Sequence, residues 1–184
     1  MTITLAVSEQ AAIETVRDIL LASEDDLISG ISFQGAQKRI QPLATSVLTP
    51  PTGYIAMAVD CNNVRTASAD QSVVRNPPRI NYYQVTIVIV DAAYIEYGEE
   101  APFAQAHENF RLVADRVMSL IESSYRGWVE HTASGLKFQL WRNRGNDRAV
   151  DKTNIIPRLA PNDDTIIELR CAVSFTLESR CQPS

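Results

Sequence analysis

Few residues of the types that carry out chemistry occur in this chain of 184 residues, and their spacing matches no common catalytic motif. The two histidines, His107 and His131, are not accompanied by a Gly-x-Ser-x-Gly or Gly-x-x-x-x-Gly-Lys sequence. His107 lies on or beside the apolar stripe of a predicted helix, where a packed, hydrogen-bonded histidine is commoner than a catalytic one. His131 follows Trp128 in a predicted turn, so we expect it at the surface.

The three cysteines and the acidic pairs also favour structural roles. Cys61, Cys171 and Cys181 form no Cys-x-x-Cys unit, and their odd number argues against a disulfide framework, which indicates reduced thiols. Cys171 should point inward from a strand as a small apolar side chain. The acidic pairs at 25–26 and 163–164 could bind a divalent cation only if they converged, and solvated carboxylates are commoner. We therefore expect no enzyme, no metal and no cofactor.

A charged segment between two predicted strands is the best candidate for contact with other molecules. It contains Arg142, Arg144, Asp147 and Arg148, and Trp141 precedes it. Arginine is enriched at protein interfaces because its planar guanidinium makes bidentate contacts, and tryptophan adds an amphipathic anchor. Three uses stay open for this segment: an interface arm, a solvated hairpin, or a contact with nucleic acid.

Two long strands must position these residues. Residues 166–178 place apolar side chains at every second position, from Ile167 to Leu177, which predicts a strand with one buried face in an antiparallel sheet. Thirteen residues at ~3.3 Å each span ~43 Å, so this strand must bend or extend beyond the core. Residues 80–91 predict a second strand whose outer face is polar at one end and apolar at the other. Either another subunit covers part of that face, or the strand is central with both faces covered.

Two helices are predicted to cover the sheet. The first runs over residues 8–22, where Ser8 is a plausible N-cap. The second runs over residues 102–124, with Pro102 in its first turn and an apolar stripe from Phe103 to Ile121. Its predicted length of ~35 Å makes it the obvious lid for the sheet.

The remaining segments complete a single domain, residues 1–184. Residues 54–59 alternate between apolar and other side chains, which predicts a strand. Residues 61–79 are polar and are predicted to form a long loop, and residues 136–156 are expected to form a hairpin arm. The predicted fold is α+β: a mainly antiparallel sheet with one long amphipathic helix on one face, an N-terminal helix and a protruding hairpin.

Composition excludes several classes of protein. The chain is 45% hydrophobic and 21% charged with a formal charge of −5, as in a soluble globular protein. Its 22 acidic residues outnumber 17 basic ones, which disfavours a free-standing nucleic-acid binder. The apolar windows are shorter than the ~20 residues that span a bilayer, so we expect a cytosolic protein with no membrane contact.

The order of elements resembles that of the tail terminator proteins of tailed bacteriophages. Residues 80–94, 103–124, 136–144 and 166–180 carry this resemblance. It implies a homohexameric ring in the virion that caps the tail tube, ends its polymerisation and provides the surface for head attachment. The implied partners are the tube protein and, in some phages, sheath and neck proteins. DNA would pass through the bore, and the negative charge of the protein would repel its phosphates.

Two charged elements are predicted to meet between neighbouring subunits. One is the hairpin, and the other is the acidic segment that leads into the second helix. A head-to-tail ring needs a different surface on each side of a subunit. The predicted interface residues are Trp141, Arg142, Arg144, Asp147, Arg148, Glu96, Glu99 and Glu100.

Two other functions stay open. The chain could be another head-tail connector or tail component, which has similar architecture. It could instead be an enzymatic or small-molecule-binding α+β domain, with a pocket between the second helix and the sheet near His107 and Tyr83.

Overall fold

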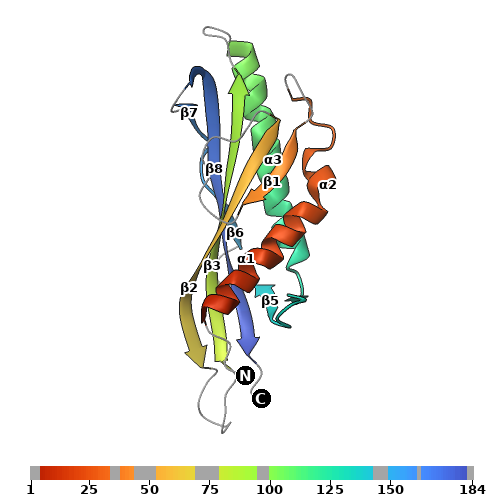
Figure 1. The fold of residues 1–184 in the computed structure, drawn as a ribbon, viewed down its shortest axis with the longest axis vertical. Coiled ribbons are helices and arrows are strands. Elements are labelled where there is room, and N and C mark those ends of the chain that lie inside the picture. Colours follow the sequence, from red (N-terminus) through yellow and green to blue (C-terminus); the bar gives the residue numbers. More distant parts are fainter. Residues whose placement is uncertain are drawn as a thin grey trace.

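One curled sheet and three helices make up the described part of the protein (Figure 1). The computed structural model describes residues 5–33, 38–43, 53–68, 79–94, 100–142, 149–160 and 163–181. The helices are α1 (Leu5–Ala22), α2 (Glu24–Ile28) and α3 (Glu100–Ser124). The strands are β1 (Arg39–Leu43), β2 (Tyr54–Ser68), β3 (Arg79–Tyr94), β4 (Val129–Glu130), β5 (Lys137–Leu140), β6 (Val150–Lys152), β7 (Ile156–Ala160) and β8 (Asp163–Cys181). The predicted α+β fold is confirmed.

The pair β3 and β8 forms the centre of the sheet. These strands are antiparallel along all of β3, from Arg79 opposite Cys181 to Tyr94 opposite Ile166. β8 has 19 residues, which at ~3.3 Å each is about 60 Å, so it runs the length of the elongated molecule (Figure 1). β2 pairs antiparallel with the other side of β3, and β1 adds to β2 in parallel.

Both long helices cover the same face of the sheet. Alternation along the central strands puts Ile87 and Val173 in one buried cluster, together with Val16 of α1 and Val117 of α3. Because side chains on a strand alternate between faces, the residues between these buried positions, such as Val88, lie on the opposite face. The predicted role of the long helix as a lid is therefore confirmed, and α1 shares it.

A buried ion pair joins the segment before β1 to the end of β3. Lys38 Nζ donates to the Asp91 carboxylate and, at 3.1 Å, to the backbone oxygen of Ala92. The ammonium also lies 5.4 Å from the centre of the Phe33 ring. Burial raises the pKa of Asp91, and the positive charge of Lys38 opposes that shift. This contact holds Lys38, directly before β1, against the end of β3.

The predicted loop over residues 61–79 is wrong over its first eight residues. β2 continues to Ser68 and keeps its pairing with β3, with one register shift between Asn63 and Arg65. β1 pairs only with Tyr54 to Ala58, so within the described residues the rest of β2 is an edge strand. Polar residues are tolerated on such an edge, which explains why the sequence did not look like a strand. Residues 69–78 lie outside the described residues.

The predicted hairpin over residues 136–156 is also wrong in its pairing. β5 and β6 do not pair with each other, since both pair antiparallel with β8: Leu140 is opposite Leu177, and Val150 is opposite Phe175. β7 continues along the same side of β8. The three short strands thus form one interrupted strand along that side of β8. Residues 143–148 lie outside the described residues.

Candidate subunit interface

Trp141 and Arg142 stand where the interrupted strand departs from β8. The Trp141 backbone N–H donates to Thr176 O at 2.9 Å, which keeps Trp141 in register with the sheet. Its ring meets the Tyr82 ring edge to face, with centroids 5.8 Å apart. Trp141 is 37% exposed, and the Arg142 side chain is also exposed. Both residues were predicted interface residues, and their exposure leaves them free to contact another molecule.

A second exposed tryptophan lies on the same part of the sheet. Tyr82, Glu178 and Gln139 are successive partners across β3, β8 and β5, on the face away from the buried core. Extending the pairing of Val129 with Phe138 by one residue puts Trp128, which is 40% exposed, opposite Gln139. Sequence analysis treated Trp128 only as a residue near a turn, and no periodic signal marked it because the strand it precedes has two residues.

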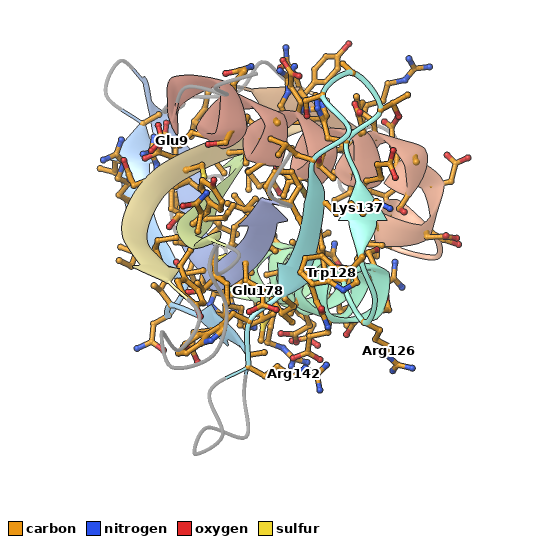
Figure 2. All side chains as sticks on the ribbon, turned by 90° about the horizontal axis from the view of Figure 1, so that it is seen from below. Glu9, Arg126, Trp128, Lys137, Arg142 and Glu178 are labelled. Carbon is orange, nitrogen blue, oxygen red and sulfur yellow. The ribbon has the colours of Figure 1, made fainter. Side chains whose placement is uncertain are left out.

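We call Tyr82, Trp128 and Trp141, with Arg126 and Arg142 beside them, the aromatic surface. Figure 2 shows Trp128, Arg126, Arg142 and Glu178 gathered at the lower end of the molecule. Exposed tryptophan and arginine side chains are the residue types that dominate binding energy at protein interfaces. The arrangement can therefore bind another macromolecule through stacking and guanidinium contacts.

The two guanidinium groups differ from several other cations of the described residues. Lys38, Arg111, Lys152 and Arg158 each have a carboxylate within ion-pair distance. Neither Arg126 nor Arg142, by contrast, forms an ion pair with any residue that the structure describes. The two guanidinium groups of the aromatic surface are thus exposed and form no ion pair with a described residue, while the carboxylate of Glu178 lies in the same row of the sheet.

β7 provides a second exposed apolar element. Ile156 and Leu159 are 61% and 59% exposed, although they belong to a strand. β7 pairs with β8 on one side, and no described strand pairs with its other side. Pro157 within β7 fits an edge strand, because proline cannot donate a ladder hydrogen bond. Sequence analysis assigned Ile156 to the end of a hairpin and did not single out β7.

Within one chain the two predicted interface elements lie far apart, which does not test their predicted contact between neighbouring subunits. Glu100 is the first residue of α3, which follows the upper end of β3, whereas Trp141 lies beside Tyr82 near the lower end. Twelve strand residues separate Tyr82 from Tyr94, which corresponds to about 40 Å. Arg144, Asp147, Arg148, Glu96 and Glu99 lie outside the described residues, so their predicted roles stay predictions.

The predicted surface position of His131 is wrong. Its side chain is buried, with Nε2 3.0 Å from Glu14 Oε2 and Nδ1 2.8 Å from Ser134 Oγ. Ser134, His131 and Glu14 are thus connected in the same order as the nucleophile, base and carboxylate of a catalytic triad. However, Ser134 Oγ also accepts from Leu136 N–H at 3.3 Å, and the N–H groups of Ser134 and Gly135 donate to His131 O. These turn amides cannot stabilise an oxyanion. The contacts instead fasten the β4–β5 turn to α1.

The residues of the alternative pocket are also far apart. His107 is half-buried beside Phe103, with ring centroids 6.1 Å apart. Tyr83 is buried against Phe138 at the other end of α3, close to Tyr125. Eighteen residues separate His107 from Tyr125, about 27 Å along a helix. His107 and Tyr83 therefore cannot line one small pocket.

The buried thiols are poor nucleophiles. Burial raises the pKa of both Cys61 and Cys171 to about 12, because the apolar core disfavours the thiolate. Cys171 points into the core, as predicted. Among the residues that the structure describes, no three His, Cys, Asp or Glu side chains gather in a way that could hold a metal ion.

Comparison with known proteins adds no relative. No protein-family model matches the sequence, and no curated protein matches it significantly. Within the described residues, no helix has both the length and the apolar character needed to cross a membrane.

Proposed function

We propose that this chain is a structural protein of a bacteriophage virion, a tail terminator that forms a homohexameric ring at the head-proximal end of the tail. In this role it ends polymerisation of the tail tube and offers the surface to which the head attaches. Its partners are then other copies of itself and the tube protein, with sheath or neck proteins beyond them. DNA passes through the bore without sequence-specific binding.

The observation that carries this proposal is the aromatic surface. Trp128 and Trp141 are large, exposed and rigid, and the neighbouring guanidinium groups have no internal ion pair among the described residues. Exposed apolar side chains that gather in one patch are typical of interaction sites on soluble proteins. The exposed apolar edge at β7 supports the same conclusion, since a ring subunit needs more than one contact surface.

The negative net charge supports the part of the proposal that concerns DNA. The chain has a formal charge of −5, so an assembled ring would carry several times that charge. Like charges repel, and a duplex moving through such a ring would find few sites to which its phosphates could bind.

The test is to measure the mass of the purified protein by native mass spectrometry and light scattering, alone and with tail tubes. We expect a six-fold assembly, at least in the presence of tubes, and tubes of uniform length when the protein is added during their polymerisation. A protein that stays monomeric with tubes, and leaves their length distribution unchanged, would contradict the proposal.

Imaging a particle that contains the chain separates the terminator from another connector or tail component. A terminator must lie between the end of the tube and the head. A location within the tube or at the distal tip would assign the chain to a different structural role.

A further inference from the structure

The aromatic surface has a complementary surface on the same molecule. Leu21 at the end of α1 is 48% exposed. Asp18 on α1 and Asp25 and Asp26 on α2 surround it in the sequence, and their side chains are exposed. None of these three carboxylates forms an ion pair with a described residue. We call Asp18, Leu21, Asp25 and Asp26 the acidic knob.

The acidic knob and the aromatic surface lie on different sides of the chain. The knob belongs to α1 and α2, which cover the core face of the sheet. Tyr82 and its row partner Glu178 point to the opposite face. In Figure 2, Glu9 of α1 lies on the opposite side of the view from Arg126, Trp128 and Arg142.

We propose that the acidic knob of one copy docks on the aromatic surface of the next copy. This proposal rests on the proposed ring and assigns its subunit contact. Leu21 would pack against Trp128 and Trp141 at the centre of the contact, and the carboxylates of the knob would meet the guanidinium groups of Arg126 and Arg142 at its rim. The two surfaces are then complementary: an exposed leucine packs on aromatic rings, and carboxylates face guanidinium groups.

The placement of the two surfaces favours a head-to-tail arrangement over a two-fold dimer. In a two-fold interface, residue i of one subunit contacts residue j of the other and the reverse, so the acidic knob and the aromatic surface would have to lie on one side of the subunit. They lie on different sides, so a two-fold interface cannot form both of these contacts at once. A head-to-tail contact between the two patches has no such restriction. Repeated around a closed rotation, it generates a ring.

A second copy also suits the aromatic surface better than a nucleic acid does. Single strands do bind to aromatic platforms next to cations. However, the chain as a whole has a formal charge of −5, which disfavours the binding of phosphates. A nucleic acid would also leave the exposed Leu21 and carboxylates of the acidic knob uncovered, whereas a second copy covers both surfaces. Binding to single-stranded DNA is therefore an alternative outcome of the test.

The test uses two charge reversals and their combination in the full-length chain. One variant carries Asp25→Lys with Asp26→Lys, the second carries Arg126→Glu with Arg142→Glu, and a third carries all four changes. We expect each double reversal to weaken assembly about tenfold or more at low salt, because like charges then oppose each other across the contact. The fourfold variant restores opposite charges, so its assembly should return to within about threefold of the original. Light scattering over a concentration series measures all of these effects.

Control variants reverse exposed charges on other elements. Asp60→Lys on β2 and Arg39→Glu on β1 should assemble like the unchanged protein, since both lie outside the two surfaces. Circular dichroism and a thermal melt of every variant show that the fold is kept. A labelled single-stranded oligonucleotide is titrated in parallel.

The outcomes separate this inference from the proposed function. If the unchanged protein forms rings but the double reversals assemble equally well, or the fourfold variant stays as weak as they are, the subunit contact is elsewhere and only this inference fails. If the oligonucleotide binds tightly and Arg126→Glu with Arg142→Glu abolishes that binding without affecting assembly, the aromatic surface is a nucleic-acid site and the inference fails. If the unchanged protein does not assemble even with tubes, the proposed function itself fails.

Discussion

At the scale of single residues, several buried ionisable groups are held by partners within the chain. Lys38 neutralises Asp91 inside the core, and His131 is held between Glu14 and Ser134. Cys61 and Cys171 act as apolar side chains there. None of these residues offers a reactive group to solvent, so their substitution should change stability and leave intermolecular contacts intact.

Removing the cation of the buried ion pair should be costly. Lys38→Met leaves the Asp91 carboxylate buried without its partner, and we expect the free energy of unfolding to fall by about 3–5 kcal/mol. Adding Asp91→Leu should recover most of this loss, because no charge is then buried. Denaturant unfolding at pH 7 measures both. Lys137→Met serves as control, since its pair with Glu130 is exposed and should contribute less than about 1 kcal/mol.

The same variant should show a characteristic pH dependence. In Lys38→Met, burial raises the pKa of Asp91 without an opposing charge, so the folded protein binds a proton more tightly than the unfolded chain. The resulting stabilisation is complete below the unfolded pKa of ~3.9 and is lost as pH rises through the folded value. The stability deficit should thus be smaller at pH 5 than at pH 8. A deficit that is equal at both pH values would show that Asp91 is solvated.

The two core thiols should resist alkylation in the folded protein. Their pKa of about 12 leaves almost no thiolate at pH 8, and the core excludes the reagent. In a Cys181→Ser background, intact-mass measurement should find no iodoacetamide adduct under native conditions and two adducts after denaturation. Labelling of the native protein at the rate of a free thiol would mean that the core opens readily.

At the scale of elements, the interrupted strand beside β8 is the most informative feature. Leu140 and Val150 occupy positions two residues apart along β8, and Trp141 fills the position between them. Between Leu140 and Val150, the register along β8 therefore has room for one residue, whereas the chain has nine. The additional residues, 142–149, include four of the five predicted interface residues of this segment, which suits an insertion kept for contact with another molecule.

Deleting residues 142–149 should leave the fold intact. Joining Trp141 directly to Val150 gives a continuous strand in the existing register, so we expect the free energy of unfolding to change by no more than about 1 kcal/mol. A second variant replaces the same eight residues with glycine and serine, which keeps the length but removes the charges. Thermal and denaturant unfolding measure both variants. Loss of the folded state in the deletion would contradict the observed register.

At the scale of the whole molecule, one face of an elongated sheet is used for the core and other surfaces are left for contacts. α1 and α3 cover one face, and the aromatic surface occupies the lower end of the opposite face. Core residues such as Phe138 and exposed residues such as Trp128 should therefore respond differently to substitution, although both are aromatic.

Trp128→Ala should weaken assembly without unfolding the protein. We expect a loss of about 2 kcal/mol or more in association. The free energy of unfolding should fall by less than for a core aromatic residue, since 40% of the side chain is exposed. Phe138→Ala should instead lower the free energy of unfolding by about 3–5 kcal/mol, because it empties a filled core position. Calorimetry and light scattering distinguish the two effects. Equal assembly of Trp128→Ala and the unchanged protein would remove Trp128 from the contact.

The sequence by itself determined the elements whose residues carry a strong periodic pattern. The alternation around Val173 and the apolar stripe around Val117 located β8 and α3, because period-two and helical spacing depend only on neighbours in the chain. The exposure of Trp141 and Arg142 could be predicted for a similar reason, since they end an alternating run and begin a polar one.

Only the tertiary structure decided which strands pair and which residues lie near one another on the sheet. β5, β6 and β7 are too short to predict their own pairing, and they all pair with the long strand β8. The polar end of β2 does not look like a strand in the sequence, and it extends to Ser68 because β3 is long enough to pair with it. The same long-range register puts Trp128 near Trp141 and Glu100 at the far end of the molecule. Pairing register depends on contacts between segments distant in sequence, and no local pattern contains that information.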